Sequence, residues 1–185
     1  AVAEKECKVR GITFETITDG AANALITEIQ NPSANMNVVK LLNAPKIAVY
    51  SPKTKQPWDD AVTLVLTYAE IPYDIVFDDE VLGGKLLEYD WLHLHHEDFT
   101  GQFGKFYSSY SSAPWYQAEV AEAESMAKKH GFGSPRELKK AVVMKIRDFM
   151  LGGGFLFAMC SATDTYDIAM AAAETDICEA MFDGT

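Results

Sequence analysis

The chain has 185 residues with a formal net charge of -11, and 48% of its residues are hydrophobic. Its length suits one domain with a full core, and its composition is that of a globular protein. The acidic charge argues against nucleic acid as a partner, because phosphate binding needs a basic surface. No apolar run is long enough to span a bilayer, so we expect no membrane span.

The start of the chain and its cysteines leave the compartment open. The sequence begins with Ala1 rather than methionine, which fits processing, trimming or an excerpt. Export after cleavage of a signal peptide is therefore an alternative to a cytoplasmic location. The spacing of Cys7, Cys160 and Cys178 matches neither a zinc ribbon nor a disulfide-rich scaffold, although one disulfide and one free thiol fit the count.

Residues 1–43 are expected to form an N-terminal extension that is separate from the rest. The stretch KVRGITFETI, residues 8–17, predicts a strand. The stretch from Ala21 to Leu42 predicts a helical segment that breaks at Asn31–Pro32.

Residues 44–185 alternate between short apolar runs and amphipathic segments. The apolar runs predict strands, and the amphipathic segments predict helices. Among the helices, one begins after Ser134 as N-cap with Glu137 completing a capping box. Such alternation predicts an α/β fold, a three-layer sandwich with a mostly parallel, doubly wound sheet. The expected strands are Lys46–Tyr50, Tyr73–Phe77, Asp90–His95 and Gly153–Cys160, and the expected helices are 58–71, 114–130, 135–151 and 163–174.

Ligands of doubly wound sheets bind at the carboxyl ends of the strands. This rule selects four segments: Ser51–Lys55, Asp78–Glu80, His95–Gln102 and Cys160–Thr163. The acidic segment is a candidate cation site, but a solvated surface turn is the favoured explanation. The serine- and aromatic-rich stretch that follows the histidines is long enough to act as a binding loop or merely to cover a sheet edge.

Cys160 ends a predicted buried strand and precedes a predicted helix. The unpaired N–H groups of a helix start lower the pKa of a thiol and stabilise an oxyanion, so this place favours a nucleophile. A strained strand-to-helix turn is also how hydrolases expose a nucleophile. The alternative is an inert core residue, because cysteine is among the most buried residue types.

The segment IRDFMLGGGFLFAMCSATDTYDIA resembles the nucleophile segment of the class I glutamine amidotransferase-like superfamily, and YDWLHLHHED resembles the strand of that group in which YD precedes apolar residues. The amino-acid sequences of both segments are also similar to those of bacterial proteins labelled asparagine synthetase B-like. The resemblance implies a flavodoxin-like α/β domain over residues 44–185. It also implies a cysteine-dependent amide hydrolase or acyl transferase, with a small-molecule or peptide amide as substrate.

Several residues depart from the pattern of that superfamily. Met159 directly precedes Cys160, Ala162 takes the place of the later glycine of G-x-C-x-G, and Ser161 stands where its proteases have histidine. No histidine follows Cys160, whereas the amidotransferases place a His and a Glu downstream. Three explanations stay open: the chain continues past Thr185, the base comes from elsewhere, or the strand-to-helix turn at Cys160 (the elbow) is catalytically silent. The ending ICEAMFDGT lacks a closing strand, which favours a truncated domain.

The segment HLHHED supplies the candidate base. His95 or His96 would accept the proton of Cys160, Glu97 or Asp98 would orient the imidazole, and the backbone around Ser161 would hold the oxyanion. Zinc binding by His93, His95, His96 and Asp98 is a further hypothesis, although no second ligand cluster is present. No other cofactor is expected.

Two function classes follow from these residues. The first is the cysteine-dependent enzyme just described. The second is a non-catalytic module of the same fold that binds a protein partner or a second copy of itself within a larger protein. The missing triad partners favour the second class, and the predicted elbow favours the first.

Overall fold

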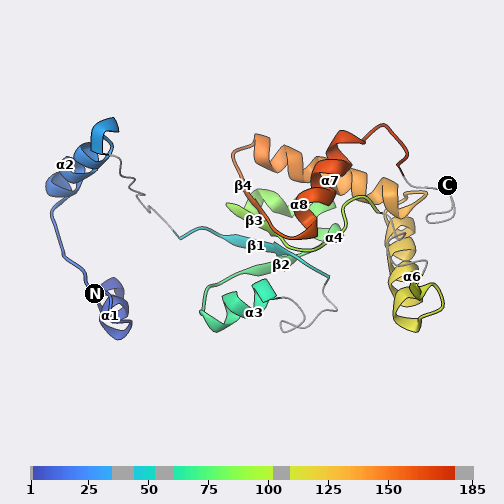
Figure 1. Cartoon of the computed structure of the whole chain (residues 1–185), viewed down its shortest axis with the longest axis horizontal. Helices are drawn as coiled ribbons and strands as arrows, with labels where there is room; N and C mark the ends of the chain where they lie inside the picture. Colours follow the sequence, from blue (N-terminus) through green and yellow to red (C-terminus); the bar gives the residue numbers. More distant parts are fainter. Residues whose placement is uncertain (1, 35–43, 53–60, 102–108, 178–185) are drawn as a thin grey trace. The chain divides into compact units, whose positions relative to one another are not determined.

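The structure is a computed structural model that describes residues 2–34, 44–52, 61–101 and 109–177. The chain divides into two compact units, Ala1–Ala44 and Pro45–Thr185 (Figure 1). Each unit has its own secondary structure, and we describe them separately.

The first unit is helical. It contains α1 (Val2–Val9), α2 (Asp19–Ile29) and the short 3-10 helix η1 (Pro32–Ala34). The Thr18 hydroxyl caps α2 by accepting a hydrogen bond from the N–H of Ala21 at 3.3 Å. The predicted helix is therefore confirmed up to its break before Pro32, and residues 35–42 of the predicted segment lie outside the described residues. The predicted strand at residues 8–17 is wrong, because residues 8 and 9 end α1, the chain turns at Gly11 with φ +66°, and no strand occurs within this segment.

The second unit contains a four-stranded, all-parallel sheet. Its strands are β1 (Ile47–Tyr50), β2 (Asp74–Val76), β3 (Trp91–Leu94) and β4 (Phe155–Ala158). They lie in the order β2-β1-β3-β4. The register pairs Val49 with Ile75 on one side and with His93 on the other, and His93 with Phe157. The predicted α/β fold with a parallel sheet is thus confirmed, with each strand slightly shorter than its apolar run.

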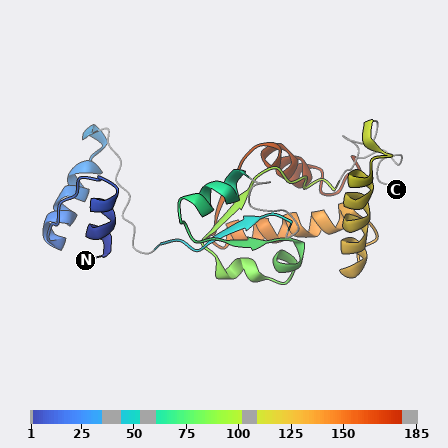
Figure 2. The ribbon, with the colours of Figure 1, turned by 90° about the horizontal axis from the view of Figure 1, so that it is seen from below.

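Helices flank this sheet. They are α3 (Ala61–Tyr68), α4 (Asp78–Leu82), η3 (Lys85–Glu88), α6 (Pro114–Lys129), α7 (Pro135–Leu151) and α8 (Ser161–Ala171). Figure 2 shows α3 and α4 on opposite sides of the strands, as right-handed crossovers in opposite directions require. The α7 cap differs in one detail from the prediction: the Ser134 hydroxyl accepts from the N–H of Glu137, but the Glu137 carboxylate accepts from the N–H of Gly133.

The core lies on one face of the sheet. Alternate residues of β1 and β3, including Tyr50 and Leu92, are fully buried there. They pack in one cluster with residues of α4, α7 and α8, namely Val81, Val142, Val143, Ile146, Phe149 and Ala162. This packing fixes the position of α8, and with it the junction between β4 and α8.

The other face is less covered than the sequence suggests. Phe155 and Phe157 of β4 are 56% and 43% exposed. On α3 the buried residue is Thr63, whereas the apolar residues Leu64, Val65 and Tyr68 are exposed. The pattern of apolar residues therefore identified the helix but not the side that packs.

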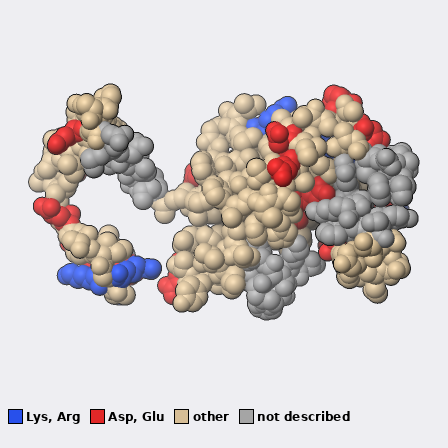
Figure 3. Space-filling view, in the orientation of Figure 1, with Lys and Arg blue, Asp and Glu red and all other residues tan. Residues whose placement is uncertain are grey.

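The charged surface agrees with the acidic composition. On the face shown in Figure 3, acidic side chains of the second unit are spread over several elements, and basic ones are few among the residues described. Within the described part of the chain, no helix combines the length and apolarity needed to cross a membrane.

Candidate functional site at the carboxyl edge of the sheet

A run of three glycines leads from α7 into the strand that ends at the site. Gly152 caps α7, and Gly153 has φ +100°, a conformation that favours glycine. A Cβ atom on Gly154 would lie 2.2 Å from the ring of Phe149. The chain can therefore reverse from α7 into β4 within three residues and still bury the Phe149 ring.

Cys160 forms the junction between β4 and α8. Only Met159 and Cys160 separate the last residue of β4 from the first residue of α8. Cys160 has φ +52° and ψ -141°, a conformation that non-glycine residues rarely adopt, and its side chain is exposed. Strained backbone of this kind is concentrated at functional sites. The structure thus has a sharp strand-to-helix turn with an exposed thiol at the position predicted for the nucleophile.

The first turn of α8 is bound to the loop that follows β3. The N–H of Ala162 donates to the carbonyl of His95 at 3.3 Å. The Ser161 hydroxyl donates to the carbonyl of His96 at 2.8 Å, and the Thr165 hydroxyl donates to that of Glu97 at 2.9 Å. The backbone of the predicted histidine base is therefore attached to the residues that follow Cys160. One candidate oxyanion donor, the N–H of Ala162, is already engaged.

His95 and His96 lie in contact with each other. Their Nδ1 atoms are 2.9 Å apart, so one ring donates and the other accepts. The Nε2 atom of His96 lies 3.7 Å from Oε1 of Glu97. The structure thus brings these three predicted residues together. His93 is 5% exposed and stacks on Phe157 with ring centroids 5.4 Å apart, and its ring centroid lies 6.4 Å from that of His95.

The four predicted zinc ligands are not arranged as a ligand set. Asp98 accepts hydrogen bonds from the N–H and the hydroxyl of Thr100, which fold its own loop. In residues 2–34, 44–52, 61–101 and 109–177, no three His, Cys, Asp or Glu side chains are grouped so that they could hold a metal ion. The zinc hypothesis therefore has no geometric support in the described chain.

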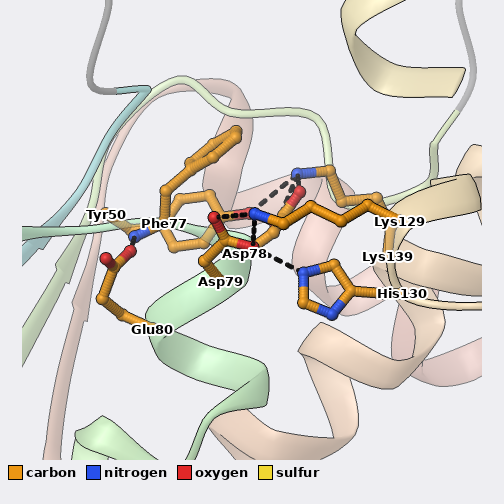
Figure 4. A network of polar contacts seen from close by, with 8 residues as sticks. All are labelled: Tyr50, Phe77, Asp78, Asp79, Glu80, Lys129, His130 and Lys139. Carbon is orange, nitrogen blue, oxygen red and sulfur yellow. Dashed lines mark hydrogen bonds and ion pairs between the residues drawn. The ribbon is translucent and has the colours of Figure 1, made fainter. Parts of the chain in front are cut away.

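The segment Asp78–Glu80 begins α4 instead of forming a loose turn. Glu80 accepts a hydrogen bond from the N–H of Phe77 at 3.0 Å. Asp79 binds Lys129 and His130, whose nitrogen atoms lie 2.7 and 2.6 Å from its carboxylate oxygens (Figure 4). Asp79 is thus paired with side chains of the protein, and Glu80 binds the backbone at the start of its own helix, so both carboxylates have structural contacts.

A buried network at the ends of β1 and β2 was missed by the sequence analysis. Asp78 accepts a hydrogen bond from the Tyr50 hydroxyl, and Nζ of Lys139 lies 2.7 Å from that hydroxyl (Figure 4). Burial, and then the charge of Asp78, raise the pKa of the Tyr50 hydroxyl well above its ordinary value. The charge of Glu97 acts in the same direction, so the network lies near the histidine loop.

Comparisons with known proteins identify no family or relative of this chain. No model of a protein family matches the chain, and neither a curated protein nor a solved structure is significantly similar to it.

Proposed function

We propose that the second unit is a cysteine-dependent amide hydrolase or acyl transferase related to the class I glutamine amidotransferase-like proteins, with Cys160 as its nucleophile. The observation that carries this proposal is the exposed thiol held at φ +52° between β4 and α8. An all-parallel sheet with the order β2-β1-β3-β4 agrees with a doubly wound, three-layer domain of that type.

The proposed reaction begins with proton transfer from Cys160 to the pair formed by His95 and His96. The sulfur then attacks the amide carbon, and the C–N bond breaks as the amine leaves with a proton from the imidazole. Water, or another amine in a transferase, then attacks the thioester and releases the acyl group. Glu97 would stabilise the protonated His96 ring, because its carboxylate lies 3.7 Å from Nε2.

The test is formation of an acyl-enzyme on the intact chain. Incubation with glutamine or with a peptide amide should release ammonia and add the acyl mass to Cys160, detected by mass spectrometry. Cys160→Ser should abolish the adduct, and His96→Asn should slow its formation. Cys7 is the internal control, because it is a free thiol in the first unit. An unmodified Cys160 with every amide tested would contradict the proposal for those substrates.

The second candidate is a non-catalytic binding module. Two observations favour it: the N–H of Ala162 is occupied by the His95 carbonyl, and β4 exposes Phe155 and Phe157 at a sheet edge. Exposed aromatic side chains next to one another suit a protein partner or a second copy. Sedimentation equilibrium distinguishes these cases, because self-association should be lost in Phe157→Ser, whereas a monomer at all concentrations would exclude the second copy.

A further inference from the structure

Four consecutive carbonyl groups, from the last residue of β3 onward, accept hydrogen bonds from the chain around Cys160. The carbonyl of Leu94 accepts from the N–H of Met159 at 3.0 Å, which is the last bond of the β3–β4 ladder. Beyond it the ladder is replaced by α8, whose first turn binds the next three carbonyls. Two of these three bonds come from side-chain hydroxyls, those of Ser161 and Thr165.

The hydroxyl groups of these two side chains make long-range hydrogen bonds instead of capping their own helix. A serine or threonine near a helix start usually caps its own helix. Here the Ser161 and Thr165 hydroxyls instead donate across to the backbone of a loop 65 and 68 residues earlier. These two hydrogen bonds are therefore tertiary contacts. One is accepted by the carbonyl of His96, a proposed base, and the other by the carbonyl of Glu97, which would orient that base.

We propose that Thr165, together with Ser161, is a positioning residue that fastens the His95–Glu97 loop to the helix carrying Cys160. The part of this inference that concerns catalysis rests on the proposed function. Thr165 does not touch the thiol. It acts through the loop, because its hydroxyl holds the carbonyl of Glu97 one turn beyond the elbow. The fastened loop holds the backbone that carries both imidazoles against the first turns of α8.

This inference gives Ser161 a positioning role in addition to the oxyanion role expected for its backbone. The sequence suggested its backbone as an oxyanion donor, whereas its hydroxyl is committed to the carbonyl of His96. A substitution at Ser161 therefore alters the histidine loop as well as the start of α8. Thr165 is the cleaner position to test, since it lies within α8 and its side chain is partly buried.

The experiment compares Thr165→Val with Thr165→Ser on the full chain. Valine has the shape of threonine without the hydroxyl, and serine keeps the hydroxyl. Thr163→Val is the matched control, because Thr163 lies on the same turns of α8 and is exposed. Two readouts are taken: hydrogen–deuterium exchange of the peptide that covers residues 95–98, and the rate of iodoacetamide labelling of Cys160 divided by that of Cys7.

Loss of one hydrogen bond should raise exchange of residues 95–98 by about fivefold in Thr165→Val. The labelling ratio should fall by a similar factor of about five, because the base is no longer held near the thiol. Thr165→Ser should restore both values, and Thr163→Val should change neither. Unchanged exchange in Thr165→Val would overturn the inference, as would equal effects of Thr163→Val.

The two readouts separate this inference from the proposed function. If exchange rises in Thr165→Val but the labelling ratio does not fall, the hydroxyl fastens the loop and has no part in activating Cys160, which overturns the positioning role. If Cys160 of the unaltered chain is labelled no faster than Cys7, the proposed function fails, and the positioning role fails with it. A fall in the ratio with restoration by serine supports both.

Discussion

Nζ of Lys139 lies 3.0 Å from both carboxylate oxygens of Asp78, and the Asp78 side chain is only 2% exposed. The ammonium group also lies 4.6 Å from the centre of the Phe77 ring. The pair joins the start of α4 to α7 beneath the carboxyl edge of the sheet. It supports the site without being part of the proposed chemistry.

Removal of the cation from this pair should be costly. Lys139→Met leaves a buried carboxylate without its cation, and we expect a loss of about 3–5 kcal/mol in the free energy of unfolding. Lys140→Met is the matched control, because its partner Glu174 is 87% exposed, and it should cost less than about 1 kcal/mol. Urea denaturation of both variants measures the difference, and equal losses would contradict the assigned role of Lys139.

The contacts of Asp79 predict a weaker stability at acid pH. Hydrogen bonds from Lys129 and then His130 hold the pKa of the Asp79 carboxyl below its ordinary value. A carboxyl with a lowered folded pKa contributes stability above its unfolded pKa of about 3.9, and this contribution is lost as the pH falls through the folded value.

The corresponding variant is Asp79→Asn. Its melting temperature should fall less steeply than that of the unaltered chain between about pH 5 and pH 2. The reason is that the variant has no carboxyl at position 79 whose stabilising contribution acid could remove. Asp167→Asn, at an exposed aspartate of α8, should keep the original slope. Parallel curves for Asp79→Asn and the unaltered chain would show that these contacts do not stabilise the fold.

The three glycines before β4 should differ in their tolerance of alanine. A Cβ atom on Gly154 would meet the Phe149 ring at 2.2 Å, so Gly154→Ala should destabilise the chain by about 1–3 kcal/mol through overpacking. Gly152 has φ -77°, and a Cβ there would meet its nearest atoms at 3.4 Å. Gly152→Ala should therefore change stability by less than about 1 kcal/mol. Thermal denaturation of the two variants checks the order.

The backbone at Cys160 should reject a β-branched side chain. With φ +52°, Cys160→Val is expected to lose about 1–3 kcal/mol, whereas Cys160→Gly should stay within about 1 kcal/mol of the original. Met159→Val controls for the change in side-chain shape at the neighbouring exposed residue. A well-tolerated valine at position 160 would mean that the turn is not strained.

The sequence predicted the features that depend on local patterns. The four apolar runs, the Ser134 cap and the glycines before β4 each act within a few residues, so they can be read without knowing the fold. The place of Cys160 at the β4–α8 junction follows from those runs, whereas the order of the strands in the sheet was not predicted. The buried side of α3 could not be predicted, because Thr63 is buried and Leu64 exposed only as a result of tertiary packing.

The polar contacts of the site were harder to predict. Tyr50, Asp78 and Lys139 come from three elements far apart in the chain, and no spacing relates them. Thr165 contacts the Glu97 carbonyl, and a backbone acceptor leaves no trace in the sequence. The signal that existed was the alternation of hydroxyl residues in CSATDT, which the sequence analysis interpreted only as the start of a helix.

The most direct measurement is iodoacetamide labelling of the full chain near neutral pH, followed at each cysteine by peptide mass spectrometry. We predict that Cys160 reacts at least about ten times faster than Cys7, because its thiol is exposed at the start of α8 and thiols at helix N-termini are often reactive. We also predict that a double substitution, His95→Asn with His96→Asn, removes most of this difference. Equal rates at Cys160 and Cys7 in the unaltered chain would contradict the claim that this turn presents a reactive nucleophile.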